Sequence, residues 1–166
     1  MSEPTAPGQG ELTHLDPRGH ARMVDVGAKE ITGRTATAEC RVLLAPATAR
    51  RLLDGDLPKG DALPVVRIAG IQAAKRTADL LPLCHPVALT SVDVDVEVDA
   101  TTGVITITAT ARAADRTGIE MEALTAVSVA GLTLYDLVKA VQKDVRITDT
   151  RLRRKTGGRS GDVSLP

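Results

Sequence analysis

The chain has almost no aromatic residues: its 166 residues include one tyrosine, Tyr135, and neither Phe nor Trp. Proteins that bind single-stranded nucleic acid without sequence preference stack the bases on aromatic side chains, so this function class is disfavoured. The core must instead be built from Val, Leu, Ile and Ala, which favours closely packed helices and strands. A chain of this length buries roughly 70% of its unfolded surface, so a full core is available.

Excess charge of one sign, a cysteine framework and long apolar runs are also missing. Lys plus Arg number 21, as do Asp plus Glu, so we expect no bulk attraction to nucleic acid or to a membrane surface. Two cysteines, Cys40 and Cys84, are too few for a disulfide framework and indicate reduced thiols. No uninterrupted apolar run approaches the ~20 residues of a membrane span, and no signal pattern opens the chain. These absences predict a cytoplasmic protein.

The chain is expected to form one domain with two less ordered ends. Residues 1–20 are rich in Pro, Gly, Ser and Thr and are predicted to form a mobile arm. Residues 21–155 carry the pattern of a single folded domain. Residues 156–166 are predicted to be a flexible, basic, Gly-rich loop and tail. With Lys155, this loop is equally well interpreted as a backbone-plus-lysine cradle for phosphate.

Alternation of apolar and polar residues predicts four strands. The clearest is SVDVDVEVD, in which Val92, Val94, Val96 and Val98 alternate with polar residues. A turn over residues 99–103 joins it to a second alternating run, residues 104–111, as a hairpin. Residues 34–44 and 145–153 have strand character as well.

Helices are predicted between these strands. Pro46 opens a short helix that runs to residue 56, and a turn at 57–61 precedes a second helix over 62–81. A long helix over 117–144 is apolar and small-sided between charged ends. The order strand, helix, strand, strand, helix, strand predicts an α+β, ferredoxin-like βαββαβ fold, with a four-stranded antiparallel sheet and helices on one face.

The long helix also predicts an oligomer. Its central residues are small: Ala126, Ser128, Ala130, Gly131 and Thr133. Because a single sheet covers only one side of a helix, the other side is expected to meet a second subunit. Cover by the helices of residues 46–81 is the alternative.

Charged residues follow one stripe of this helix. Asp136, Lys139 and Lys143 are spaced i, i+3 and i+7, which places them on one side. An ordinary ion pair explains the first two. An apolar setting would also desolvate them, and desolvation moves a lysine pKa toward neutrality and suits it to act as a general acid.

Two glutamates mark the other end of the long helix. Thr117 and Glu120 have the spacing of a capping box, which explains Glu120 structurally but leaves Glu122 unexplained. Glu122 and Asp136 are 14 positions apart, or roughly 21 Å along a helix. They cannot serve one small reacting centre within one chain. Either the substrate is long or the site combines two subunits.

His85 lies in the stiff connection LPLCHP. It could donate to a phosphate or relay a proton, or it could be a loop histidine bonded to backbone. Cys84 beside it suggests a metal ligand, but no ligand-spaced partner exists, so neither a metal site nor a cofactor is predicted.

Three long segments resemble one enzyme family. They are GIQAAKRTADLLPLCHP (70–86), TGIEMEALTAVSVAGLTLYDLVKAVQKD (117–144) and RRKTGGRSGD (153–162), with weaker matches at 23–26 and 59–61. They resemble the cyclic pyranopterin monophosphate synthases of molybdenum cofactor biosynthesis, over about residues 12–162. The resemblance implies a lyase that converts a cyclised GTP derivative, 3′,8-cyclo-7,8-dihydro-GTP, to cyclic pyranopterin monophosphate and releases pyrophosphate.

The resemblance further implies a ferredoxin-like catalytic domain and a homohexamer, a trimer of dimers, with active sites between subunits. It places catalytic roles on Asp136, Lys139, Lys59 and Lys155, and substrate contacts on Leu83, Cys84, His85, Glu120, Met121 and Glu122. Our hypothesis is that Asp136 takes and returns protons, Lys139 tunes it, and Lys59 is a general acid. A non-catalytic phosphate- or nucleotide-binding module and a purely structural oligomer are the alternatives.

Overall fold

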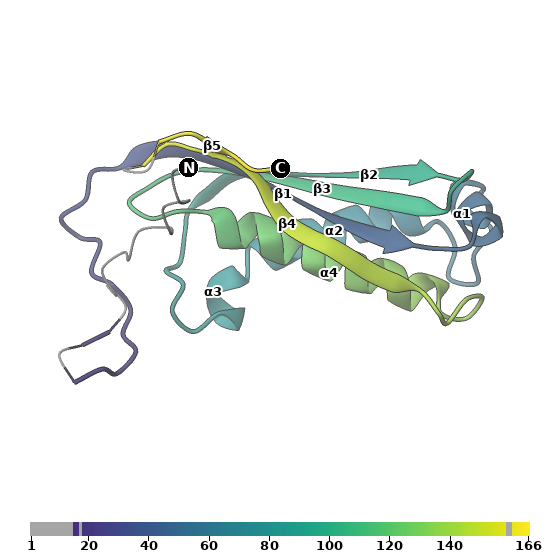
Figure 1. The fold of residues 1–166 in the computed structure, drawn as a ribbon, viewed down its shortest axis with the longest axis horizontal. Helices are drawn as coiled ribbons and strands as arrows, with labels where there is room; N and C mark the ends of the chain where they lie inside the picture. The colour runs from purple at the N-terminus through teal and green to yellow at the C-terminus, as the bar shows by residue number, and fades with distance from the viewer. Residues whose placement is uncertain (1–14, 17, 159–160) are drawn as a thin grey trace, which may run out of the picture.

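The computed structural model describes residues 15, 16, 18–158 and 161–166. Most of the arm expected over residues 1–20 lies outside the described residues. In the described part, one open antiparallel sheet carries all the helices on one of its faces (Figure 1). The α+β class and the antiparallel sheet with helices on one face are therefore confirmed.

The sheet has five strands in the order β2-β3-β1-β4-β5. Their bounds are β1 Thr32–Leu43, β2 Leu89–Asp99, β3 Val104–Asp115, β4 Arg146–Thr156 and β5 Val163–Ser164. The four predicted strands are present, and each is longer than predicted. The fifth is new: β5 pairs Val163 with Lys155 and Ser164 with Arg154, so the last residues return along β4.

The helices are α1 Pro46–Leu53, α2 Ala62–Ala74, α3 Thr77–Leu80 and α4 Glu120–Val138. The prediction of a single helix over residues 62–81 is wrong, because the helix is interrupted between α2 and α3. Thr77 is buried there, and its hydroxyl donates to the carbonyl oxygen of Ala74 at 3.0 Å. Asp61 caps α2 by accepting from the amide of Leu63 at 3.2 Å.

The long helix is shorter at both ends than predicted. α4 begins at Glu120 with Ile119 as its N-cap, and no side chain caps it, so the capping box predicted for Thr117 and Glu120 is wrong. Lys143 lies beyond the C-terminus of α4, so it does not continue a helical stripe. The hydroxyl of Tyr135 donates to the carbonyl oxygen of Lys143 at 3.2 Å, which holds the following segment against the helix.

Small residues let α4 pack closely on both the sheet and α2. A Cβ atom at Gly131 would lie 3.3 Å from Cys40 Sγ and from Ile147 Cγ2. A Cβ atom at Gly70 in α2 would lie 3.1 Å from Val94 Cγ2 and 3.2 Å from the Ala126 carbonyl oxygen. The alternative interpretation, that helices of residues 46–81 cover the small residues, is therefore correct for one flank of α4, because α2 packs against it. By length and hydropathy alone α4 would suit a membrane span, but half of it is buried inside the fold.

Candidate active site

The residues expected to act together fall into two clusters, one at each end of α4. Lys59, Asp136 and Lys139 form the C-terminal cluster. The N-terminal cluster holds the others, Leu83, Cys84, His85, Glu120, Met121, Glu122 and Lys155. A helix of 19 residues is about 28 Å long, so within one chain the two clusters are separate.

The C-terminal cluster is centred on the carboxylate of Asp136. Lys59 Nζ donates to Asp136 Oδ2 at 2.5 Å and to its backbone oxygen at 3.2 Å. Lys139, the C-cap residue of α4, places its Nζ 2.7 Å from Asp136 Oδ1. The turn before α2 positions Lys59, because Gly60 adopts a positive φ of 81° and its amide donates to the Leu57 carbonyl oxygen.

The charges of this cluster stabilise one another. Hydrogen bonds from Lys139 and then Lys59 lower the pKa of Asp136 to about 2. The hydrogen bond to Asp136 raises the pKa of Lys139. All three side chains are about half exposed. The expectation that desolvation brings the Lys139 pKa toward neutrality is therefore wrong for the single chain, because solvent reaches the ammonium and a carboxylate pairs with it.

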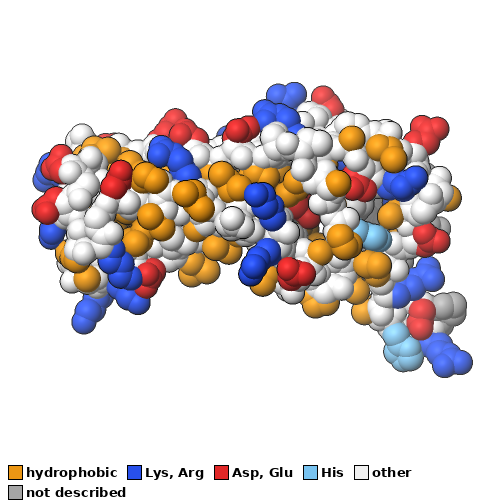
Figure 2. Space-filling model, turned by 180° about the vertical axis from the view of Figure 1, so that it is seen from behind, with side chains coloured by type: hydrophobic (Ala, Val, Ile, Leu, Met, Phe, Trp, Pro, Cys, Tyr) orange, Lys and Arg blue, Asp and Glu red, His pale blue; other side chains and the backbone are white. Residues whose placement is uncertain are grey.

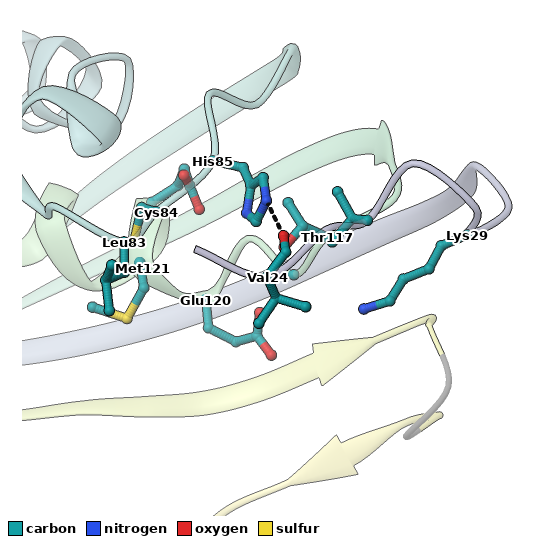
Figure 3. A pocket seen from close by; sticks show the side chains of 11 residues that line it. Val24, Lys29, Leu83, Cys84, His85, Thr117, Glu120 and Met121 are labelled. Carbon is teal, nitrogen blue, oxygen red and sulfur yellow. Dashed lines mark hydrogen bonds between the residues drawn. The ribbon is translucent and has the colours of Figure 1, made fainter. Parts of the chain in front are cut away.

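A cavity of about 440 Å³ occupies the N-terminal end of α4. Three segments meet there, as Figure 3 shows: the loop before β1, the connection after α3, and the start of α4. Its lining residues are Val24, Val26, Lys29, Leu83, Cys84, His85, Thr117, Gly118, Glu120, Met121 and Glu122. All six residues predicted to contact substrate therefore line one cavity.

His85 is held by the backbone. Its Nε2 lies 2.7 Å from the carbonyl oxygen of Val24, which can only accept, so this nitrogen carries the proton (Figure 3). The contact agrees with the interpretation of His85 as a backbone-bonded loop residue. It uses one ring nitrogen and leaves Nδ1 available for a further hydrogen bond.

Burial shifts two acidic groups of the cavity toward their neutral forms. Glu122 is only 4% exposed, and burial raises its pKa, with repulsion from Glu120 and Asp115 adding to the effect. Burial also raises the pKa of Cys84, and the charge of Glu122 adds to it. The raised pKa disfavours the Cys84 thiolate, which is the nucleophilic form of the side chain.

Glu120 lies in the same cavity but in a different electrostatic setting. Burial is the largest single influence and disfavours its charge, but the hydrogen bond from Lys155 Nζ at 2.9 Å, a backbone hydrogen bond and the charges of Lys155 and Arg34 together lower the pKa of Glu120 overall. Lys155 comes from the end of β4, just before Gly157. Gly157 has a φ of 84°, and a Cβ atom there would overlap the carbonyl oxygen of Gly33. Only glycine fits this turn without strain, and the turn positions Lys155.

Comparison with known proteins gives the same assignment as the motifs. The model of the MoaC family matches residues 23–158. This chain belongs to the MoaC family. It is 58% identical to a protein of Parvibaculum lavamentivorans over 152 residues, or 92% of this chain and 95% of the relative.

Two further relatives cover similar shares. A Chloroflexus aurantiacus protein is 55% identical over 156 residues, which are 94% of this chain and 96% of the relative. A Streptomyces avermitilis protein is 55% identical over 161 residues, which are 97% of this chain and 94% of the relative. All three relatives are named cyclic pyranopterin monophosphate synthase. The predicted family resemblance is thus confirmed.

In this member of the MoaC family the structure adds residues that the sequence interpretation missed. Lys29 and Thr117 line the cavity. Arg34 lies in a neighbouring hollow with Glu120 and Lys155, and its charge helps to lower the Glu120 pKa. Lys29 is in an irregular loop, and Thr117 was assigned a capping role. Arg34 is a basic residue at the start of a strand otherwise rich in Thr and Ala, which is a weak signal.

Across the ranges the structure describes, no group of three or more His, Cys, Asp or Glu side chains is arranged to hold a metal ion. The side chains of the two clusters offer proton donors, proton acceptors and cations to a small molecule.

Proposed function

We propose that this chain is a lyase of molybdenum cofactor biosynthesis. Its substrate is 3′,8-cyclo-7,8-dihydro-GTP, its product is cyclic pyranopterin monophosphate, and pyrophosphate leaves. The observation that carries the proposal is similarity to synthases of that name at 55–58% identity across more than nine-tenths of the chain. The match includes both clusters of candidate residues.

The C-terminal cluster is assigned the proton transfers. Opening and reclosing a pterin-like ring requires a proton acceptor next to proton donors. Asp136 is ionised, since its pKa is held at about 2, and it accepts from two lysines. In our assignment Asp136 takes and returns protons, Lys59 is a general acid, and Lys139 tunes Asp136.

The N-terminal cluster is assigned the binding of the substrate. Expulsion of pyrophosphate requires cations near the phosphates, which Lys155 and Lys29 supply. His85 adds its second ring nitrogen as a further polar group. Burial raises the pKa of Glu122 and so favours its protonated form, which donates as well as accepts a hydrogen bond and suits recognition of a heterocycle.

One substrate must contact both clusters, so we propose that the active site lies between two subunits. The helical face carries exposed apolar side chains, which are Val65, Ile68, Leu80, Met121 and Leu132. Figure 2, viewed from the side of α2, shows hydrophobic side chains gathered across this face. Two copies that pack antiparallel through this face bring Asp136 of one copy toward Glu120 of the other. Three such dimers would form the proposed hexamer.

A mixing experiment tests the shared site. Asp136→Asn and Glu122→Ala are each expected to abolish pyrophosphate release. Co-expressed in one cell, they form dimers in which one of two sites carries both substitutions and the other carries neither. Random pairing then restores about a quarter of the wild-type activity. No recovery in co-purified mixed oligomers would contradict a site between subunits.

The reaction itself is tested by incubating purified chain with the cyclised intermediate and measuring pyrophosphate. Release at enzymatic rates is expected. A well-folded oligomer that binds the intermediate without releasing pyrophosphate would instead support the non-catalytic binding module.

Two finer assignments belong to the same proposal. The order β2-β3-β1-β4, with helices in the connections after β1 and β3, supports a ferredoxin-like topology to which β5 is added. The two free cysteines, Cys40 and Cys84, support a location in the reducing cytoplasm.

A further inference from the structure

A separate group of cationic and hydroxyl side chains lies on the face of the sheet opposite the helices. Along β1, Ala36 and Ala38 are buried beneath the helices, so Thr35 and Thr37 between them face the other way. A groove of about 370 Å³ lies on this open face. It is lined by Thr35, Thr37, Thr110, Arg112, Arg154 and Thr156.

Strand register arranges these six residues in two rows across β3, β1 and β4. Thr35 pairs with Arg112 on one side and Thr156 on the other. Thr37 pairs with Thr110 and Arg154. The arginines therefore stand at opposite corners of the rectangle, with Cα atoms about 12 Å apart, as strand spacing and rise dictate. From there the Arg154 guanidinium can reach a ligand above the threonines, and Arg112 borders the groove from β3.

The side chains that line the groove are arginines and threonines, and the acid beside Thr110, Asp93 on β2, is paired with Arg112. Arg112 donates to Asp93 at 2.7 Å and to Ser91 at 3.3 Å, and the hydroxyls of Thr37 and Thr110 bond each other at 3.0 Å. Arg154 has no side-chain hydrogen bond or salt bridge to any residue in the described ranges. Its guanidinium is the unused positive charge of the groove.

The nearest acid on the same face of β1 is already neutralised. Glu39 is only 14% exposed, and it accepts from Arg151 at 2.9 Å and lies 3.7 Å from Arg153. Because Asp93 is paired with Arg112 and Glu39 with Arg151, the Arg154 guanidinium gives the groove a net positive charge. Such a site favours an anion that accepts several hydrogen bonds.

We propose that this groove binds a small phosphate-type oxyanion, inorganic phosphate or pyrophosphate. A guanidinium presents paired donors that match two oxygens of such an anion, and the threonine hydroxyls complete its hydrogen bonds. The site is distinct from the candidate active site. Lys155, between Arg154 and Thr156 in sequence, reaches Glu120 on the helical side instead.

Calorimetric titration of the full chain with inorganic pyrophosphate, and separately with phosphate, tests the proposal. Arg154→Gln is expected to weaken binding by about tenfold or more, since it removes charged hydrogen bonds. Arg146→Gln is the matched control: it is the same change on the same strand, at an exposed position outside the groove. If pyrophosphate binds more tightly than phosphate, both arginines contact the anion. If the two bind equally, only one arginine does.

Further variants locate the anion. Thr37→Val keeps the volume and the charges but removes a hydroxyl, and a loss of about threefold is expected. Lys155→Ala should leave the affinity of the groove for the anion unchanged. Binding that Lys155→Ala abolishes and Arg154→Gln does not would place the anion in the active site and overturn the proposal. Equal losses in Arg154→Gln and Arg146→Gln, or no binding to the wild type, would also overturn it.

Discussion

The two ends of α4 present ionisable groups in opposite ways. At the C-terminal end Asp136 is open to solvent, bonded to two lysines, and ionised with a pKa of about 2. At the N-terminal end Glu122 is buried, no cation among the described residues pairs with it, and its pKa is raised. Contact with cations therefore favours the charged form of Asp136, and burial favours the neutral form of Glu122. One helix thus carries two carboxyl groups, Asp136 and Glu122, whose pKa values are shifted in opposite directions.

The largest expected effect concerns the charged end. Asp136→Asn should lower the rate of pyrophosphate release by about 10²- to 10⁴-fold, the usual range for loss of a general acid–base group. The fold should be unchanged, because the side chain is exposed. Asp149→Asn, a surface acid that pairs with Arg41 at 3.9 Å, serves as the control and should keep its activity. Near-normal turnover in Asp136→Asn would remove the proton-transfer role.

A backbone change at the other end should have the next largest effect. Gly157→Ala forces a Cβ atom onto the carbonyl oxygen of Gly33 at a positive φ, and it is expected to destabilise the fold by about 1–3 kcal/mol. It should also raise KM, because Lys155 is displaced. Gly161→Ala has a similar φ but open space around the Cβ atom, so it should leave KM unchanged. Equal KM values for both variants would show that the turn at Gly157 does not position Lys155.

The pH dependence of stability should distinguish the two glutamates of the cavity. Because the folded pKa of Glu122 is raised, its stabilisation is present below its unfolded pKa and is lost as the pH rises through the folded value. Glu122→Gln should therefore gain thermal stability relative to wild type as the pH rises from about 4 to neutral and above.

Glu120 should show the opposite sign. Its folded pKa is lowered, so its stabilisation is present above the unfolded pKa and is lost as the pH falls through the folded value. Glu120→Gln should therefore be less stable than wild type near neutral pH and approach it on acidification. Melting temperatures of both variants across this range are the measurement. Parallel profiles would show that the cavity does not shift the pKa values of the two carboxyl groups in opposite directions.

The smallest expected effect is on stability at the charged end. Lys139→Gln removes one of the two cations on Asp136, but the pair is half exposed and solvent screens it. Its melting temperature should match that of wild type while turnover falls severalfold. A clear loss of stability would give Lys139 a structural role beyond its proposed tuning of Asp136.

Local patterns predicted the strands well and the helix ends poorly. Val92, Val94, Val96 and Val98 specify a half-buried strand by their spacing alone. The start of α4 could not be derived this way, because Glu120 bonds Lys155, a residue 35 positions away, instead of closing a capping box. β5 has only two residues, and its pairing with β4 is its only signal.

The site was predicted only in part for a similar reason. Helical spacing placed Asp136 beside Lys139 and separated both from Glu122. The partnership of Lys59 with Asp136 joins residues 77 positions apart, and only the family resemblance suggested it. Lys29 reaches the cavity from an irregular loop, where no periodicity shows which way a side chain points. The pKa of Lys139 could not be predicted either, because it depends on how much solvent reaches it.

The solitary Tyr135 gives the molecule a built-in optical probe. With no tryptophan in the chain, near-ultraviolet absorption and emission come from one phenol ring. Tyr135 precedes Asp136 in the sequence, and its hydroxyl donates to the Lys143 carbonyl oxygen. Any ligand or neighbouring subunit that arrives at this end of α4 changes the surroundings of the only fluorophore. Arrival of a neighbouring subunit at the charged cluster can therefore be followed in the unlabelled protein by tyrosine emission.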